Sequence, residues 1–330
     1  MVYVEIFRRI GGGVLPPLLQ KPKRHKAEGE VCQAVGTQCE DDMNFWVSQL
    51  FNGISYGALL FLLAGGLTLI FGAMNIVNVA HGSFYLIGGY IGFEVIRLTG
   101  NFYIGILAAG IFVGILGLFI EPVFLRKMEG KEPGNDLKQM LVTMGIAVLI
   151  QDSCLLIWGG DPYMIQTPGY LKGAAQIGPF FFPRIRLFII AYAMLIFLCV
   201  WWFYGRTSIG AKLRATVDND EMASGLGINV DRIRRGVFAL GAVLCGFGGV
   251  IGCSFMGIAL GIEFEILPLA FVIVILGGTG SLTGALVGSF LVGITDNLGK
   301  ALFPELSYFT LFAPLAIILA FKPTGLFGRG

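Results

Sequence analysis

Charged side chains, histidine and closely spaced cysteines are scarce in this chain of 330 residues. Lysine, arginine, aspartate and glutamate make up 13% of it, about half the share found in average soluble domains. Two histidines are too few for a multi-histidine metal site, and the six cysteines include no C-x-x-C pair. A net charge of +2 gives no overall field that would indicate nucleic acid as a partner. Metal-centred, disulfide-stapled and nucleic-acid-binding proteins are therefore poor matches.

Apolar residues and glycine, in contrast, are abundant. Hydrophobic residues make up 55% of the chain, glycine occurs 49 times, and the mean hydropathy is +0.79. Such a composition excludes disorder, which needs low hydrophobicity and high charge. The length would accommodate about eight membrane helices of roughly 20 residues each. We therefore expect an all-α polytopic membrane protein with about eight transmembrane helices.

Apolar runs recur from Phe45 onward and set the expected spans. The predicted ranges are 46–72, 76–97, 101–125, 138–158, 186–204, 236–258, a broken, Gly-rich helix pair near 266–299, and 306–321. A glycine cluster divides the broken pair. Broken helices are tolerated at membrane depth only where they face protein or water, often along a transport path. The candidate path residues in this cluster are Gly277, Gly278 and Gly280.

The first 44 residues differ from the rest. They hold 12 of the 44 charged residues and lack the apolar region of a secretory signal. We predict that 1–44 is a polar N-terminal extension, either disordered or preceding a natural start at Met43, and that 45–329 is the transmembrane domain.

Basic residues set the orientation. Loops 126–138 and 205–235 carry four and six of them, and the two loops lie an even number of predicted spans apart. Both loops, and with them the C-terminus, should face the cytoplasm because basic loops stay inside.

Each group of polar residues near the predicted spans has two possible roles. Asn75, Asn78 and His81 recur every three residues at the start of the second predicted span, where they either cross-link helices or line a solute path. Three acidic residues near outer span ends either meet a solute ammonium group or are solvated at the interface. These are Glu94, Asp152 and Asp296.

Signatures of enzymes are missing from the sequence. Neither Gly-Lys pair, at 130–131 and at 299–300, has the upstream glycine and the following Ser or Thr of a Walker A motif. The G-x-S-x-G pattern at 53–57 opens an apolar helix, and only one histidine follows it, so helix packing explains it better than a nucleophile does. We expect a chain without an ATPase site or any other catalytic residue.

Loop 205–235 contains a short charged helix. Asp218 and Glu221 have capping-box spacing, and the glycines Gly225 and Gly227 end the apolar-polar stretch that follows. A short capped helix between two spans is suited to docking into a cytosolic partner, although a solvated loop helix would look similar.

Three ordered segments carry a family resemblance. Asn52-Gly53 with 69–82, the loop 213–229, and the stretch 274–285 are similar to the signatures of the LivH/LivM-type ABC permeases of branched-chain amino-acid importers. The resemblance covers about 45–329, and the arrangement resembles the LivH half more than the LivM half.

The resemblance implies a non-catalytic permease in the bacterial cytoplasmic (inner) membrane. Its partners would be a second, LivM-like permease, two cytosolic ABC ATPase subunits that bind ATP and Mg, a periplasmic solute-binding protein and membrane lipid, with no cofactor on this chain. The default solutes are branched-chain or other neutral amino acids. The alternatives are urea or short amides and, in another class, an ion-driven secondary transporter. The implied coupling residues are Asp218, Glu221, Ala223, Gly225 and Gly227.

Overall fold

The computed structural model describes residues 24–126, 135–178, 180–322 and 325–328. The chain divides into two compact units, Met1–Val47 and Ser48–Gly330. The described residues of the first unit, from Arg24 on, belong to helix α2. The expected extension falls outside the described residues over 1–23, as the expected cytoplasmic loop does over 127–134. The domain boundary at residue 44 stays a prediction.

Helices make up most of the described chain. In order, the elements are α2 (Arg24–Met74), α3 (His81–Thr99), α4 (Phe102–Ile120), a π-helical turn (Glu121–Leu125), α5 (Asn135–Trp158), a 3₁₀ turn (Gly169–Leu171), β1 (Ala174–Ile177), β2 (Phe180–Pro183), α6 (Arg184–Arg206), α7 (Ser208–Asp218), α8 (Asp220–Gly225), α9 (Val230–Phe255), α10 (Ile262–Gly277), α11 (Leu282–Leu302), a 3₁₀ turn (Pro304–Leu306) and α12 (Ser307–Phe321).

The all-α polytopic class is confirmed. Among the described residues, six helices are long and apolar enough to cross a membrane, namely α2, α4 with its π-helical turn, α5, α6, α9 and α11. The remaining long helices, α3, α10 and α12, do not meet both conditions. The exact number of spans therefore stays a prediction.

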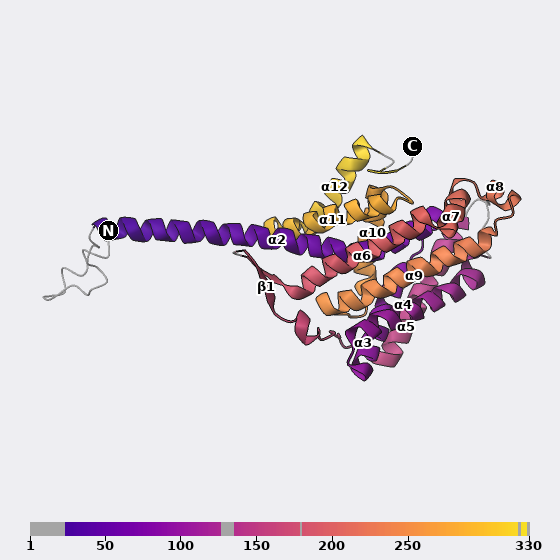
Figure 1. Cartoon of the computed structure of the whole chain (residues 1–330), viewed down its shortest axis with the longest axis horizontal. Coiled ribbons are helices and arrows are strands. Elements are labelled where there is room, and N and C mark those ends of the chain that lie inside the picture. Colours follow the sequence, from indigo (N-terminus) through magenta and orange to yellow (C-terminus); the bar gives the residue numbers. More distant parts are fainter. Residues whose placement is uncertain (1–23, 127–134, 179, 323–324, 329–330) are drawn as a thin grey trace. The chain divides into compact units, whose positions relative to one another are not determined.

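Helix α9 packs in the middle of the second unit, against α3 and α4 on one side and α2 on the other (Figure 1). Glycine makes these close contacts possible. A Cβ on Gly66 of α2 would lie 2.5 Å from the carbonyl oxygen of Gly241, and one on Gly88 of α3 would lie 2.7 Å from Cα of Gly246. Close backbone approach of this kind stabilises helix pairs in lipid, where hydrophobic burial gives no preference for helix contact.

The two ends of the bundle carry different elements. A short antiparallel hairpin, in which Ala174 pairs with Pro183, precedes α6, and α7 follows it, so the hairpin and α7 lie at opposite ends. The sequence did not predict this hairpin.

Helix α2 runs antiparallel to α9, because Leu62 lies beside Gly248 and Gly66 beside Gly241. The end of α2 therefore lies at the α7 end of the bundle. Gly280, which follows α10, packs against Gly72 near that end of α2. The C-terminal segment 325–328 follows α12 and pairs with the end of α10. It therefore lies at the same end of the bundle as α7 and α8.

Candidate solute path and coupling surface

The backbone is not helical between α2 and α3. Residues 75–80 leave the helix at Asn75, whose φ of 54° is left-handed, and α3 begins only at His81. The Ser83 hydroxyl donates to the carbonyl of Ala147 (3.3 Å), which is the tenth residue after Leu137 in the span Leu137–Trp158. Helix α3 therefore begins at the depth of the middle of α5.

The structure corrects the expected stripe at the start of the second span. Because 75–80 are not helical, the spacing of three residues does not place Asn75, Asn78 and His81 on one helix face. Asn75 is exposed, whereas Asn78 and His81 are fully buried. The predicted path role of all three stays a prediction, but only two of them lie together in the interior.

His81 is held from two sides. Its Nε2 lies 3.0 Å from the carbonyl oxygen of Leu63, and its own carbonyl oxygen accepts a hydrogen bond from the Cys245 thiol (2.9 Å). A ring nitrogen facing a carbonyl must carry the proton, so Nδ1 of a neutral ring is an acceptor. Within the described residues, neither Nδ1 nor either amide atom of Asn78 has a hydrogen-bond partner. A buried polar group without a partner costs about 1–3 kcal/mol.

The predicted glycine cluster forms a tight turn between α10 and α11. Gly278 and Gly280 have φ values of 95° and 76°, a region of the backbone map that glycine occupies without strain. A Cβ on Gly277 would lie 2.4 Å from the carbonyl carbon of Gly284, and one on Gly72 would lie 2.6 Å from Cα of Gly280. The cluster is thus packed against α11 and the end of α2.

The C-terminal segment closes over the same turn. The N–H groups of Leu326 and Phe327 donate to the carbonyls of Leu276 and Gly277, at 2.8 and 3.0 Å. Gly277 and Gly278 are buried beneath these contacts, and Gly280 is half-buried. The cluster is closed in this conformation, and its place along a path stays a prediction.

Sequence reasoning missed two glutamates at the start of α10. The expected broken pair began at residue 266, which left Glu263 and Glu265 in a loop. In the structure both lie in the first turn of α10. Acidic residues directly before an apolar run are typical of a helix start, and this signal could have found them.

Glu263 is buried and Glu265 is exposed. The Glu263 side chain accepts a hydrogen bond from the Gly261 N–H through Oε2 (2.9 Å), while Oε1 has no partner within the described residues. Its carbonyl oxygen lies against Gly82, where an added Cβ would be only 2.7 Å away. Glu263 therefore shares the depth of the α3 start, in the middle of the membrane, and Glu265 lies two residues further along the helix.

The exposed side of α10 holds one carboxylate among apolar residues, and exposed threonines follow it toward α11. We call this side of α10, with the start of α11, the α10–α11 face. Its exposed residues are Phe264, Glu265, Pro268, Ile275, Thr279 and Thr283. A carboxylate at membrane depth is costly unless it faces protein or water. The α10–α11 face is therefore not a surface for lipid tails.

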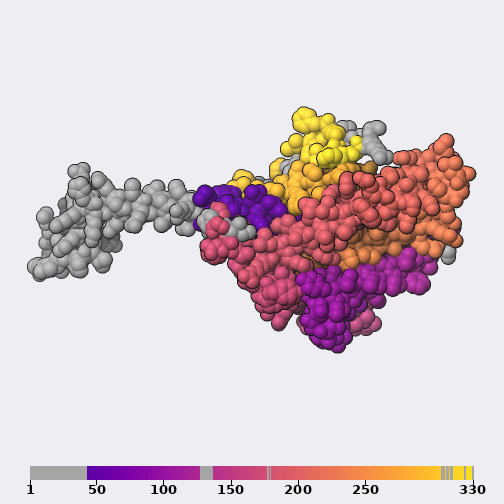
Figure 2. Space-filling model, viewed as in Figure 1, coloured from indigo at the N-terminus to yellow at the C-terminus, as the bar shows by residue number. Residues whose placement is uncertain are grey.

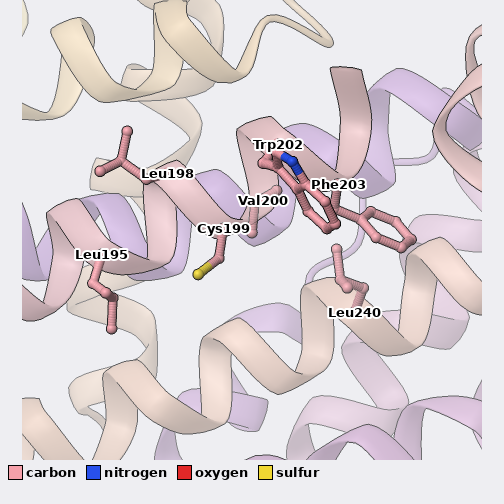
Figure 3. Close-up of a pocket in the computed structure, with 7 residues that line it drawn as sticks. All are labelled: Leu195, Leu198, Cys199, Val200, Trp202, Phe203 and Leu240. Atoms are coloured by element: carbon pink, nitrogen blue, oxygen red, sulfur yellow. The ribbon is translucent and has the colours of Figure 1, made fainter. Parts of the chain in front are cut away.

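An apolar groove lies on a different face, between α6 and α9. Helix α6 forms much of the visible surface of the second unit (Figure 2). The groove has a volume of about 520 Å³, and the described residues that line it are Leu195, Leu198, Cys199, Val200, Trp202, Phe203 and Leu240 (Figure 3). These side chains offer no charge to a solute, so the groove is unsuited to a polar cargo.

The predicted loop 205–235 contains the helices α7 and α8, and its last residues belong to α9, which ion pairs connect to neighbouring elements. The Arg235 guanidinium binds the buried carboxylate of Glu121 (3.3 Å), and Arg126 pairs with Asp231. Asp220, the first residue of α8, pairs with Arg234 at 3.1 Å.

The capping residue of α8 differs from the expected one. The side chain of Asn219, not Asp218, accepts the hydrogen bond from the Met222 N–H (2.9 Å). Gly227, at φ 81°, follows the helix as expected.

The predicted coupling residues occupy different environments. Four of them are exposed and one, Ala223, is buried. The exposed four are Asp218, Glu221, Gly225 and Gly227. Beside them, Met222 and Leu226 expose 69% and 80% of their surface. Apolar side chains this exposed outside a membrane indicate a surface for another protein.

The helices, the break at membrane depth and the exposed α8 together define a multi-pass membrane protein of the transport type. A family model described as "Branched-chain amino acid transport system / permease component" matches residues 49–320. The chain belongs to this family, and the resemblance seen in the sequence is confirmed.

Curated relatives agree with the family. The chain is 30% identical over 298 residues to the high-affinity branched-chain amino acid transport system permease protein BraD of Pseudomonas aeruginosa, covering 86% of this chain and 96% of that protein. It is 30% identical over 303 residues to LivH of Escherichia coli K12, with the same coverage. The autoinducer 2 import system permease protein LsrC of Yersinia pseudotuberculosis is 29% identical over 269 residues, which cover 78% of this chain and 72% of that protein.

Proposed function

We propose that the chain is one permease subunit of an ATP-driven importer that moves branched-chain or other neutral amino acids across the cytoplasmic membrane. The observation that carries the proposal is the exposed carboxylate of Glu265 on the α10–α11 face, in a chain of the permease family. Because that carboxylate needs water or protein beside it, a second, related permease covers this face and encloses an aqueous path. The names of BraD and LivH support branched-chain amino acids as the cargo.

The chain supplies the path and its partners supply the energy. Two cytosolic ATPase subunits bind ATP and Mg, and they dock on α8 through Met222, Leu226 and the predicted coupling residues around them. The basic residues of α7–α9 support a cytoplasmic position for this end of the bundle, and the C-terminal segment lies at the same end. A solute-binding protein delivers the cargo at the hairpin end. ATP and the loaded binding protein shift the path between two conformations, each by binding one of them more tightly.

Reconstitution of the whole complex in proteoliposomes tests this function. We expect uptake of leucine that requires both ATP and the binding protein, and ATP hydrolysis only when the ATPase subunits are present. Glu221→Arg should leave the complex hydrolysing ATP but lower leucine uptake about tenfold, because a reversed charge at the docking surface disturbs the contact that couples α8 to the ATPase subunits. Uptake by this chain alone, without the ATPase subunits, would instead indicate a secondary transporter. Uptake of urea but not of leucine would overturn the cargo.

A further inference from the structure

Two helix starts meet at the middle of the membrane. Helix α3 begins at His81 and α10 at Ile262, and they touch where Gly82 packs on Glu263. A Cβ on Gly82 would lie 3.3 Å from Cβ of Glu263, so the glutamate side chain leaves its backbone beside the first turn of α3. The depth follows from the contacts of this turn with Ala147 and Cys245, which lie within α5 and α9.

Four buried side-chain atoms of the two segments that meet here have no partner within the described chain. They are both side-chain amide atoms of Asn78, Nδ1 of His81 and Oε1 of Glu263. All three side chains are at most 1% exposed. Buried polar groups in native proteins are almost always paired, and these three come from the two segments that converge here. Their partners are therefore a ligand, an ordered water or groups that approach in another conformation.

The two helix starts bring opposite charge to the meeting point. The start of α3 brings a positive partial charge, and the Glu263 carboxylate of α10 brings a negative charge. The first turn of α3 has backbone N–H groups without helical partners and the positive end of the helix dipole. Its capping residue is Ala80, which offers no side-chain oxygen, and the amide of Asn78 adds a donor. On the other side, Glu263 Oε1 brings negative charge, whereas His81 Nδ1 and Asn78 Oδ1 are acceptors of the α3 segment itself.

We propose that this centre, defined by Asn78, His81, Glu263 and the first turn of α3, binds the zwitterionic head group of an α-amino acid during transport. The carboxylate of the solute lies at the first turn of α3 and the Asn78 amide, and its ammonium group lies at Glu263. The proposal rests on the function proposed above and specifies its cargo, because urea and short amides carry no ammonium group for Glu263 to bind.

The centre also explains why only one carboxylate oxygen of Glu263 has a hydrogen-bond partner within the protein. Its Oε2 is satisfied by the Gly261 N–H at the start of its own helix, which holds the side chain in place and leaves Oε1 for the solute. In the present conformation the contact between Gly82 and Glu263 closes the centre. Solute entry requires α3 and α10 to separate there, as expected of a site that opens to each side in turn.

The assembled complex in proteoliposomes provides the test, with binding protein loaded with leucine at saturating concentration. We expect Glu263→Gln to lower leucine uptake at least about tenfold, since the ammonium group loses the negative charge of its partner and keeps only a weaker, neutral acceptor, while Glu263→Asp retains more uptake than the glutamine variant. The half-saturating concentration of binding protein should not change. Glu305→Gln, which removes an exposed carboxylate after α11, is the matched control and should transport like the original chain.

A second measurement needs no variant. Radiolabelled leucine bound to the complex in the absence of binding protein should be displaced by excess valine, but not by the 2-hydroxy acid with the same side chain as leucine, which has a carboxylate and no ammonium group.

The same binding measurement can be made on variants. Asn78→Asp, which places a negative charge beside the solute carboxylate, should lower leucine binding as strongly as Glu263→Gln.

The outcomes separate the two proposals. Leucine uptake at the original rate by Glu263→Gln, or displacement of bound leucine by the 2-hydroxy acid, would overturn the centre and leave the proposed function standing. Absence of leucine uptake by the unaltered complex would overturn the proposed function itself. If Glu263→Gln does not assemble, Asn78→Asp and the displacement measurement decide.

Discussion

Helices α6 and α10 both expose side chains, α6 many and α10 few, and the chemistry that they expose differs. Between residues 187 and 204, the exposed side chains of α6 are all apolar or a thiol: Ala191, Met194, Leu195, Leu198, Cys199, Trp201 and Trp202. Helix α10 exposes Phe264, Pro268 and Ile275 together with Glu265, which lies close to the middle of the membrane. The exposed side chains of the two helices therefore indicate two different surroundings.

The difference shows what covers each face. An all-apolar surface costs nothing against lipid tails, whereas a carboxylate at the same depth needs water or protein beside it. We infer that α6 faces lipid and that the α10–α11 face meets the second permease and the aqueous path. The apolar groove between α6 and α9 then belongs to the lipid-facing side, and the polar centre at Glu263 lies inward from the α10–α11 face.

A charge placed on each face gives the largest expected difference. Leu195 is the central residue of α6 and is 57% exposed, so Leu195→Asp should lower the amount of inserted, folded protein by roughly 100-fold, because aspartate at a helix centre costs about 2.5–3.5 kcal/mol on insertion. Phe264→Asp, beside Glu265, should stay within about threefold of the original, because a face that already holds a carboxylate has water or polar protein next to it. Quantitative size-exclusion of the extracted protein measures both.

Equal insertion of Leu195→Asp and Phe264→Asp would contradict the inferred difference between the surroundings of α6 and those of the α10–α11 face. Loss of both would mean that α10 is surrounded by lipid or by an apolar partner surface, and retention of both would mean that α6 faces water or polar protein.

Removing the carboxylate from the α10–α11 face tests its role directly. Glu265→Leu should leave the amount of inserted protein unchanged, but lower leucine uptake by the reconstituted complex about tenfold, since a charged group along the path typically contributes about 1.5 kcal/mol or more. Phe264→Leu, an apolar exchange at the next position of the same helix, is the control and should keep most of the uptake. A Glu265→Leu complex with full uptake would place the path elsewhere.

The sequence predicted most helices well but not the extent of the non-helical segment 75–80. Apolar runs mark helices such as α5 and α9 within a few residues, because a span must be apolar over about 20 residues whatever its neighbours are. The break at 75–80 leaves no such mark. Its Asn75 adopts a left-handed backbone, and Val79 N–H bonds to the Thr143 hydroxyl. These contacts come from a distant part of the chain, so no local pattern reveals them.

The residues of the candidate site divide in the same way, into those that a local sequence pattern reveals and those that only distant contacts bring together. Asn78 and His81 could be picked out as polar residues near a span, and the structure places both in the interior. Glu263 could not be paired with them from sequence, because 181 residues separate it from Gly82, the residue it packs on. Hydrophobicity fixes which segments enter the membrane, whereas the meeting of two helix starts depends on close glycine contacts between segments remote in sequence.

Outside the membrane, exposed apolar side chains indicate contact with a partner protein. Helix α8 carries such side chains, and a change in its capping should give the smallest effect of the three predictions. Asn219→Ala removes the oxygen that accepts the Met222 N–H and should cost about 1 kcal/mol of local stability, or about fivefold faster hydrogen exchange of that amide. Asp218→Ala should leave the exchange of the Met222 amide within twofold, because its cap is Asn219. Equal effects of the two substitutions would favour the capping residue expected from the sequence. If Asn219→Ala also weakens docking of the ATPase subunits, the exposed Met222 and Leu226 bind partners only while α8 is folded, unlike the exposed residues of α6, which need no partner protein.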